Sequence, residues 1–244
     1  PSEIRRFRRL GRRDLGPVQK LFYVLFDDVG SDAALLRKRN GDRIVPILRS
    51  SGGQEISLLV DDDDVAAGSP VRQSDPPIRA AISFGLPRVE DRDAVVGPLE
   101  DLVSHIAGYL VSESRPLHYN RTKGKRASGA MQMSCIRKRS DLSHEEFMRI
   151  WHEDHEGVAI QTQSTLGYVR NEILRVLTKE ATDDWSAFVE ETFPIEALTD
   201  PMVFWDAETD AELAAHQKKM MDSCGRFLDL SRIEVTHMSE YYFG

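Results

Sequence analysis

The chain has 244 residues, of which 41% are hydrophobic and 30% charged, a composition typical of a globular protein with a core of its own. Its net charge of −8 repels phosphate backbones, which argues against nucleic acid as a partner, and no apolar run approaches the ~20 residues of a membrane-spanning helix. We therefore expect the partner to be a small molecule. Two cysteines are too few for a disulfide framework, so we expect a reducing compartment, the cytoplasm.

The first half of the chain shows a regular order of predicted elements after a basic N-terminal arm, residues 1–17. Within residues 18–119, strand and helix patterns follow one another in the order β-α-β-β-α-β. The first helix takes Ser31 as its N-cap, and Gly41 and Pro46 indicate a break inside it. The predicted strands are 18–26, 54–60, 78–86 and 109–119, and the predicted helices are 31–53 and 90–108. This is the ferredoxin-like order, in which two helices cover one face of a four-stranded antiparallel sheet.

The second half repeats this order. Residues 120–129 are polar and basic with two glycines, which indicates a linker, and residues 130–244 begin again with a strand. The predicted strands are 130–139, 167–177, 185–193 and 232–243, with one helix from Ser143 and a helical region over 195–228 broken near Pro201. Packing the open faces of the two sheets on each other buries both. We therefore predict an α+β fold of two tandem ferredoxin-like halves packed sheet to sheet, with an eight-stranded barrel-like core and helices outside.

The helix of the second half carries two histidines among several carboxylates. Ser143 begins an S-x-x-E capping box, so the start of this helix is well defined. Phe147, Trp151 and His155 recur every four residues, which places His155 on the face turned to the sheet and His152 on the flank. An imidazole there can move a proton to or from a substrate, or it can be a core histidine paired with a carbonyl or hydroxyl group. The sequence leaves both interpretations open.

A metal site is not expected from these histidines. The zinc motif H-E-x-x-H places its histidines four residues apart, whereas His152 and His155 are three apart and have no evident third ligand. The acidic run Asp61 to Asp64 predicts a solvated loop, because successive side chains of an extended chain alternate sides. The sequence also has no Rossmann fingerprint and no P-loop, so we expect a reaction without a cofactor.

Several motifs of the second half occur together in a known family. Residues 137–174 combine a basic strand end, the helix start L-S-x-E-E-F, an aromatic residue four before a histidine, and L-G-Y-V-x-N entering a strand. A late segment keeps Phe227, Asp229, Ser231 and Arg232. This half resembles the EthD family, whose first-helix histidine corresponds to His155, although Gly157 replaces the usual proline. The first half resembles a degenerate copy without the histidine.

The resemblance implies a dimeric α/β-barrel fold. Relatives in that superfamily include muconolactone isomerases, aromatic polyketide cyclases, cofactor-free monooxygenases and haem-binding chlorite dismutases, so the fold does not choose the chemistry. We expect a cavity between the helix face and the concave sheet, with His155 as base or acid and Tyr168 or Asn171 holding an enolate oxygen. The expected substrate-binding residues are Phe147, Trp151, Phe188 and His152. Glu190 and Glu191 straddle the two faces of their strand, so we expect one of them to point into the cavity.

These residues favour a cofactor-free lyase, isomerase or cyclase that acts on an aromatic or polyketide-like carbonyl compound. The first alternative is a binding or carrier protein that shields a reactive metabolite without changing it. The second is a haem- or oxygen-dependent enzyme with a histidine as axial ligand. A homodimer is also possible, because leftover strand edges and helix faces often pair two chains.

Overall fold

The structure is a computed structural model that describes residues 18–179, 181–182 and 184–244. The predicted N-terminal arm, residues 1–17, lies outside the described residues. Within the described part, no helix is both long enough and apolar enough to span a membrane.

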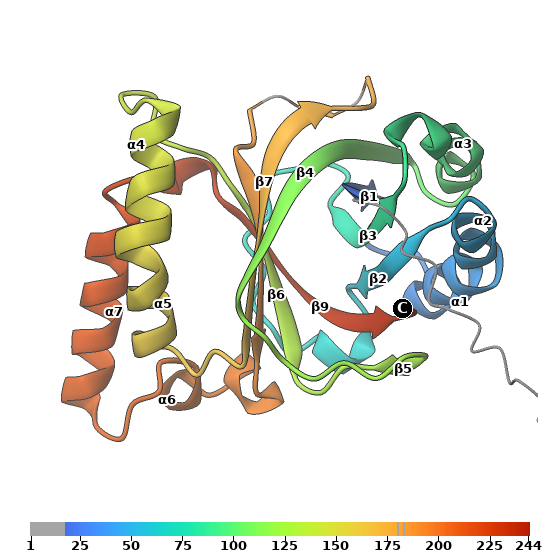
Figure 1. The fold of residues 1–244 in the computed structure, drawn as a ribbon. Helices are drawn as coiled ribbons and strands as arrows, with labels where there is room; N and C mark the ends of the chain where they lie inside the picture. Colours follow the sequence, from blue (N-terminus) through green and yellow to red (C-terminus); the bar gives the residue numbers. More distant parts are fainter. Residues whose placement is uncertain (1–17, 180, 183) are drawn as a thin grey trace, which may run out of the picture.

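The first half forms one antiparallel sheet with helices on one face (Figure 1). Its strands are β1 (Gln19–Phe26), β2 (Gln54–Val60), β3 (Ile78–Leu86) and β4 (His105–Leu117). Its helices are α1 (Ala33–Arg39), α2 (Val45–Ser50) and α3 (Asp93–Glu100), with a π-helical segment Asn40–Ile44 between α1 and α2. The strand order β2-β3-β1-β4 is that of the ferredoxin-like plan.

The second half repeats this plan with the strand order β7-β8-β6-β9. Its strands are β6 (Ala130–Ile136), β7 (Gly167–Val176), β8 (Ala187–Phe193) and β9 (Glu234–Tyr242). Its helices are α4 (His144–Arg149), α5 (Glu156–Thr162), α6 (Pro201–Phe204) and α7 (Asp210–Cys224), with a π-helical segment Ile150–His155 between α4 and α5. Short 3-10 turns cover Asp63–Val65, Val89–Arg92, Ile195–Leu198 and Leu230–Arg232.

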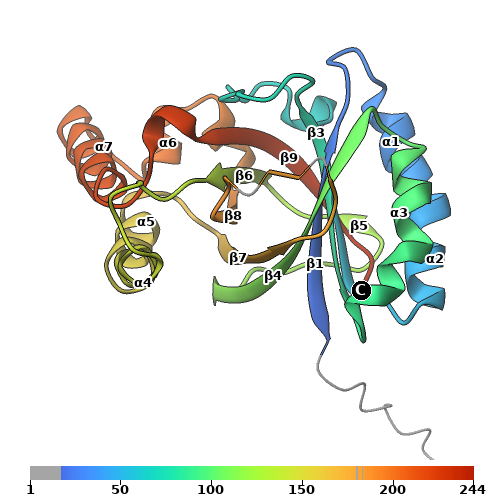
Figure 2. The ribbon, with the colours of Figure 1, turned by 90° about the horizontal axis from the view of Figure 1, so that it is seen from above.

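The two sheets join at both edges and close into one barrel. Strand β4 pairs with β7, and strand β9 pairs with β2, so eight strands form a continuous antiparallel ring. The helices of the two halves lie on opposite sides of this barrel (Figures 1 and 2). The predicted fold is confirmed, but its closure at both edges was not foreseen. The predicted linker, 120–129, contains strand β5 (Lys125–Arg126), which pairs with β9.

Three details of the first half differ from the prediction. The N-cap of α1 is Asp32 rather than Ser31, because the Asp32 carboxylate accepts a hydrogen bond from the Leu35 amide at 2.9 Å. Gly41 and Pro46 do not break the helix, since the chain passes through the π-helical segment directly into α2. The predicted helix 90–108 is limited to α3, and its last residues belong to β4, where they pair with β1.

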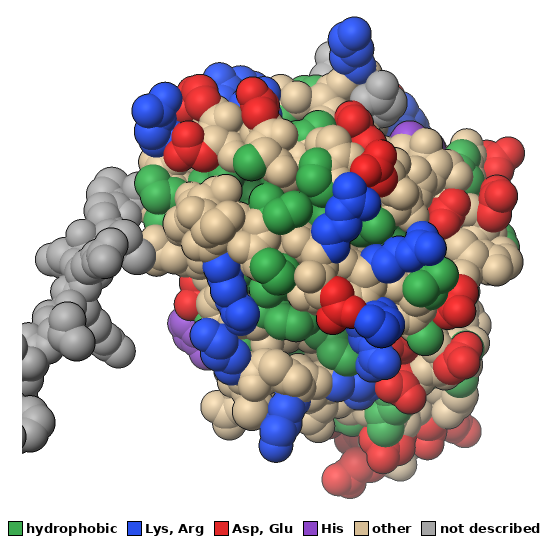
Figure 3. Space-filling view, turned by 90° about the vertical axis from the view of Figure 1, so that its right-hand side faces the viewer, with side chains coloured by type: hydrophobic (Ala, Val, Ile, Leu, Met, Phe, Trp, Pro, Cys, Tyr) green, Lys and Arg blue, Asp and Glu red, His purple; other side chains and the backbone are tan. Residues whose placement is uncertain are grey.

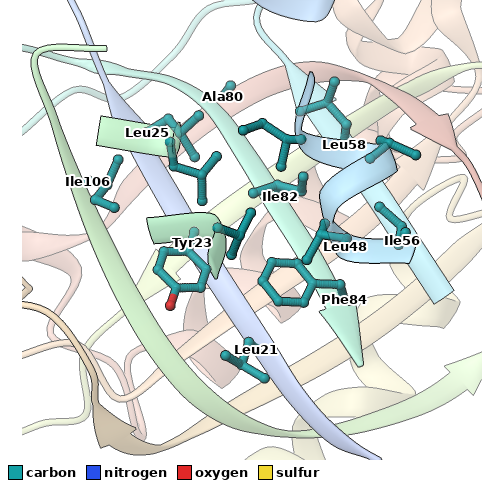
Figure 4. Close-up of a cluster of buried hydrophobic side chains, with 14 of the residues drawn as sticks. Leu21, Tyr23, Leu25, Leu48, Ile56, Leu58, Ala80, Ile82, Phe84 and Ile106 are labelled. Atoms are coloured by element: carbon teal, nitrogen blue, oxygen red, sulfur yellow. The ribbon is translucent and has the colours of Figure 1, made fainter. Parts of the chain in front are cut away.

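The alternation of side chains along each strand divides the core into three layers. One layer lies between the first sheet and its helices and includes Leu21, Tyr23, Leu58, Ile82 and Phe84 (Figure 4). The second fills the barrel and includes Phe22, Tyr109, Met131, Met133 and Phe188. The third lies between the second sheet and its helices and includes Phe147, Trp151, Tyr168, Val189 and Phe227. On the outer side of α1–α3, side chains of both charges are interspersed with apolar ones (Figure 3).

Candidate active site

The helical segment of the second half positions His155 over the sheet. It begins at Ser143, whose hydroxyl accepts the Glu146 amide at 3.1 Å while the Glu146 carboxylate accepts the Ser143 amide at 3.1 Å. This reciprocal pair confirms the predicted capping box. The segment then widens into the π-helical turn that ends at His155. Single π-turns inside helices often occur at functional sites because they redirect side chains.

His155 is held by one hydrogen bond and one contact with an aromatic ring. The side chain is 7% exposed, its Nδ1 lies 2.9 Å from the Ser223 hydroxyl on α7, and its ring centroid lies 4.7 Å from that of Phe227. Burial, followed by the positive charge of Arg226, lowers the pKa of His155 to about 4. The imidazole is therefore neutral at pH 7. A neutral imidazole can donate one hydrogen bond from its ring N–H, but it is not a charged acid at that pH.

A cavity of about 140 Å³ lies between the sheet of the second half and helices α5 and α7, and His155 borders it. Apolar side chains form most of its wall, and six residues add aromatic or polar groups: Gln132, Ser134, Trp151, Gln163, Tyr168 and Glu191. A mostly apolar space with a few converging polar groups is the usual form of a small-molecule site. The cavity lies where the sequence predicted it, between the helix face and the sheet.

Glu191 brings a second titratable group to this cavity. It lies on β8, is 8% exposed, and its Oε1 has no hydrogen-bond partner among the described residues. Burial raises the pKa of Glu191 to about 7. A carboxyl group that titrates near pH 7 therefore shares one cavity with the neutral imidazole of His155. Two groups whose pKa values are displaced in opposite directions are a frequent feature of acid–base sites.

Tyr168 and Trp151 complete the wall beside these two groups. The Trp151 indole Nε1 donates a hydrogen bond to the Tyr168 hydroxyl oxygen at 3.0 Å, and both side chains are about 1% exposed. Burial raises the pKa of Tyr168, so the hydroxyl keeps its proton at neutral pH. Its O–H group can therefore donate to a ligand while its oxygen accepts from the indole.

Asn171 and Phe188 do not belong to this cavity, which corrects the prediction that they share a site with His155. Asn171 lies three residues after Tyr168 on β7 and so points to the opposite face, into the barrel. There its Nδ2 donates to Glu190 at 2.7 Å. Phe188 also faces the barrel and stacks on Phe22, with ring centroids 4.6 Å apart.

Phe147 and His152 lie near the cavity but do not line it. Phe147 is fully buried behind Trp151, with ring centroids 5.5 Å apart. His152 is half-buried on the helix flank, and burial followed by the positive charge of Arg170 lowers its pKa. Of the seven predicted site residues, three border the cavity: Trp151, His155 and Tyr168.

Comparison with known proteins identifies the second half. Residues 139–231 match the EthD domain over most of this half. The second half of the chain contains an EthD domain. This confirms the resemblance noted in its sequence, and we call strands β6–β9 with helices α4–α7 the EthD half. No curated protein matches the chain.

Three solved structures share the fold of the whole chain. A protein of Lactobacillus acidophilus NCFM named as a candidate monooxygenase is 9% identical, with a TM-score of 0.51 over 93% of this chain and 97% of that chain. An anthrone oxidase-like protein and a dye-decolorizing peroxidase from Bacteroides thetaiotaomicron VPI-5482 are each 8% identical, with TM-scores of 0.51 over 93% of this chain and 94% of theirs. Identities this low show the fold alone, a tandem dimeric α/β-barrel within one chain.

A haem does not fit the cavity of the EthD half. A cavity of about 140 Å³ is smaller than the ~300–1,000 Å³ of common ligand pockets, and the haem macrocycle needs more room than most ligands of that class. The Nδ1 of His155 is also engaged with Ser223, and its ring packs on Phe227. The residues present do not form a haem site here. Among the described residues, no group of three or more His, Cys, Asp or Glu side chains could hold a metal ion.

Glu191, Gln132, Ser134 and Gln163 were not assigned to the site from the sequence. The alternation of β8 limited the choice to Glu190 or Glu191, and the structure places Glu191 in the cavity and Glu190 in the barrel. Gln132, which pairs with Glu191 across β6 and β8, gave a usable signal: a polar residue on the buried face of a strand. Buried polar groups of this kind need a partner or a ligand.

Proposed function

We propose that the EthD half catalyses a proton transfer on a small carbonyl compound without a cofactor, with Glu191 as the base and neutral His155 as a hydrogen-bond donor. The observation that carries this proposal is that both groups border one cavity of about 140 Å³. A base works best when its pKa lies near the working pH, and burial raises the pKa of Glu191 to about 7. A neutral imidazole can polarise a carbonyl oxygen without first losing a proton.

The reaction balances as a tautomerisation. The Glu191 carboxylate takes a proton from the carbon beside the carbonyl group, and the electron pair of that C–H bond forms a C=C bond. The π pair of the C=O bond moves to the oxygen, which His155 stabilises by donating a hydrogen bond. The protonated Glu191 then returns its proton to another carbon or to the oxygen, which gives an isomer or an enol.

Ser223 fits this assignment through its bond to the imidazole. When the Ser223 hydroxyl donates to Nδ1 at 2.9 Å, the ring proton resides on Nε2. Nε2 is then the nitrogen that can donate to a ligand oxygen. Ser223 is itself 6% exposed and lies on α7, so it is a positioning residue for His155.

We also propose that the protein acts in the cytoplasm and as a homodimer. Cys135 is buried and Cys224 is partly buried, and both are free thiols in the described structure. Free thiols persist in reducing compartments.

The test uses cyclohexanone, an enolisable ring ketone of about the size of the cavity. Exchange of its α-hydrogens in D₂O, followed by proton NMR, should be accelerated by the protein and should rise with pH through about 7. We expect Glu191→Gln and His155→Ala each to slow the protein-dependent exchange ~100-fold or more.

The matched control is His144→Ala, which changes an exposed histidine on the same helical segment outside the cavity and should leave exchange unchanged. Exchange at the wild-type rate in both cavity variants would overturn the assignment. Binding of cyclohexanone without any accelerated exchange would favour the carrier alternative instead.

A further inference from the structure

We propose that the molecule bound beside His155 and Glu191 is uncharged and contains a single six-membered ring with one oxygen substituent, as in a phenol or a cyclic ketone. This inference shares the cavity with the proposed function but does not require that the protein be an enzyme. It narrows the aromatic or polyketide-like class of ligand that the sequence predicts. Three independent features of the cavity carry it: its size, the charge of its wall, and the arrangement of its polar and aromatic groups.

The volume inside the cavity accommodates one ring. A cavity of about 150 Å³ holds one benzene molecule in a well-studied engineered protein. The cavity of the EthD half, at about 140 Å³, is of that size. A second fused ring would have to displace the packed side chains of Trp151 or Phe227, which are about 1% exposed. Protein interiors are too densely packed for such a displacement without a large cost.

The wall carries no cationic side chain among the described residues, which disfavours an anionic ligand. Two arginines behind the wall, Arg226 and Arg170, pair with carboxylates outside the cavity, although the guanidinium of Arg170 also lies 5.9 Å from the ring centroid of Trp151. Arg226 donates a hydrogen bond to Asp154 at 2.5 Å, and Arg170 forms an ion pair with Glu156 at 2.6 Å. A carboxylate or phosphate ligand would lose its hydration beside Glu191 without gaining a counter-ion, and burying an unpaired charge is costly.

The wall also disfavours an ammonium ligand at the pH where Glu191 is protonated. Burial raises the pKa of Glu191 to about 7, so at pH 6 its carboxyl group is mostly protonated and an ammonium ligand would have to displace that proton before it gained a counter-ion. The remaining polar groups, such as the amides of Gln132 and Gln163 and the hydroxyl of Ser134, suit an uncharged hydroxyl or carbonyl oxygen. Trp151 and Tyr168 offer aromatic surfaces to the ring.

The experiment compares four probes at pH 6: phenol, 2-naphthol, benzoate and benzylamine. Binding is followed by the indole N–H signals in proton–nitrogen NMR spectra of the full chain, because Trp151 lines the cavity and Trp185 and Trp205 do not. The signal of Trp151 is assigned by its loss in Trp151→Phe. We expect phenol to shift this signal in a saturable way, and the other three probes to bind at least ~10-fold more weakly.

A matched pair of variants separates the cavity from the surface. Ala159 lines the cavity and is about 1% exposed, so Ala159→Leu should abolish phenol binding by filling the space. Ala215→Leu makes the same change on the exposed side of α7 and should leave binding intact. If Ala159→Leu does not fold, the Trp151 shift in the wild-type protein still decides the question.

The outcomes keep this inference apart from the proposed function. Phenol binding at Trp151 without accelerated exchange of cyclohexanone supports the ligand class and contradicts the catalytic role. Tighter binding of benzoate or benzylamine, equal binding of 2-naphthol, or phenol binding that leaves Trp151 unshifted overturns the ligand class. The exchange rates of the Glu191 and His155 variants still test proton transfer in each of those cases.

Discussion

The two halves of the chain share one backbone plan but fill the space between helices and sheet differently. In both halves the first helix passes through a π-helical segment, and the buried side chain that ends this segment lies twelve positions after the N-cap. In the first half, Asp32 is the cap and Ile44 is that side chain. In the EthD half, Ser143 is the cap and His155 is that side chain. The same geometry thus holds an apolar group in one half and a titratable group in the other.

The sheets repeat this contrast. In the first half, Leu21 and Phe84 pair across β1 and β3 and fill the layer under the helices (Figure 4). At the equivalent strand pair of the EthD half, Gln132 and Glu191 pair across β6 and β8 and border the cavity. One half therefore has a solid apolar layer that supports the barrel. The EthD half has polar side chains at the corresponding positions and a cavity beside them, in which a ligand can bind.

The largest effect on stability is expected when a carboxyl group like that of Glu191 is placed in the apolar layer of the first half. Phe84 is fully buried, so Phe84→Glu places a carboxyl group among apolar side chains with no partner. We expect it to lower the free energy of unfolding by ~3–5 kcal/mol, measured by urea denaturation. The control Phe84→Leu should cost about 1.5 kcal/mol or less. Equal costs for the two variants would mean that the first half is as tolerant of a carboxyl group as the EthD half.

A smaller effect is expected from removing the charge in the EthD half. The ordinary pKa of a glutamate is 4.5, and burial raises the pKa of Glu191 to about 7. The folded state therefore holds this proton more tightly, so the associated stability is present below pH 4.5 and is lost as the pH rises to about 7. Relative to Glu191→Gln, the wild-type protein should lose up to about 3 kcal/mol of unfolding free energy across this window.

Urea denaturation of both proteins between pH 4.5 and 8 measures this difference. The control Glu196→Gln changes an exposed glutamate beyond the end of β8 and should follow the wild-type curve. A constant difference between wild type and Glu191→Gln at all pH values would show that Glu191 does not titrate inside the fold.

The smallest effect on stability is expected from giving the EthD half the residue of the first half. His155→Ile removes the bond to Ser223 and adds apolar surface against Phe227, and these changes oppose each other. We expect the free energy of unfolding to change by about 1 kcal/mol or less, while accelerated exchange of cyclohexanone is lost. Thermal unfolding measures the first quantity. A loss above about 3 kcal/mol would identify His155 as a core residue whose contacts serve stability.

The sequence predicted the fold well because the fold depends on repeating patterns. The order of elements, the start of the helix at Ser143 and the placement of His155 all follow from hydrophobic periodicity and capping. The sequence failed where two neighbours compete for one role. Ser31 and Asp32 both suit an N-cap, and only the hydrogen bond to Leu35 shows which residue takes it.

The composition of the site was less predictable than its location. Asn171 and Phe188 were assigned to the wrong face, although the odd spacing from Tyr168 to Asn171 was enough to separate them. The choice of Glu191 over Glu190 needed the register of β8 against its neighbours. The volume of the cavity and the displaced pKa values depend on the packing of several elements, which no local pattern contains.

The pairing of β9 with β2 also determines how this chain must reach its native state. Ser57 on β2 donates a hydrogen bond to Glu240 on β9 across a separation of 183 residues. While the ribosome is still making the intervening chain, the open edge of β2 has no native partner and can recruit foreign strands. Contacts this distant in sequence also slow folding. A chaperone would therefore be most useful before β9 emerges, because it could cover the unpaired edge of β2 during that interval.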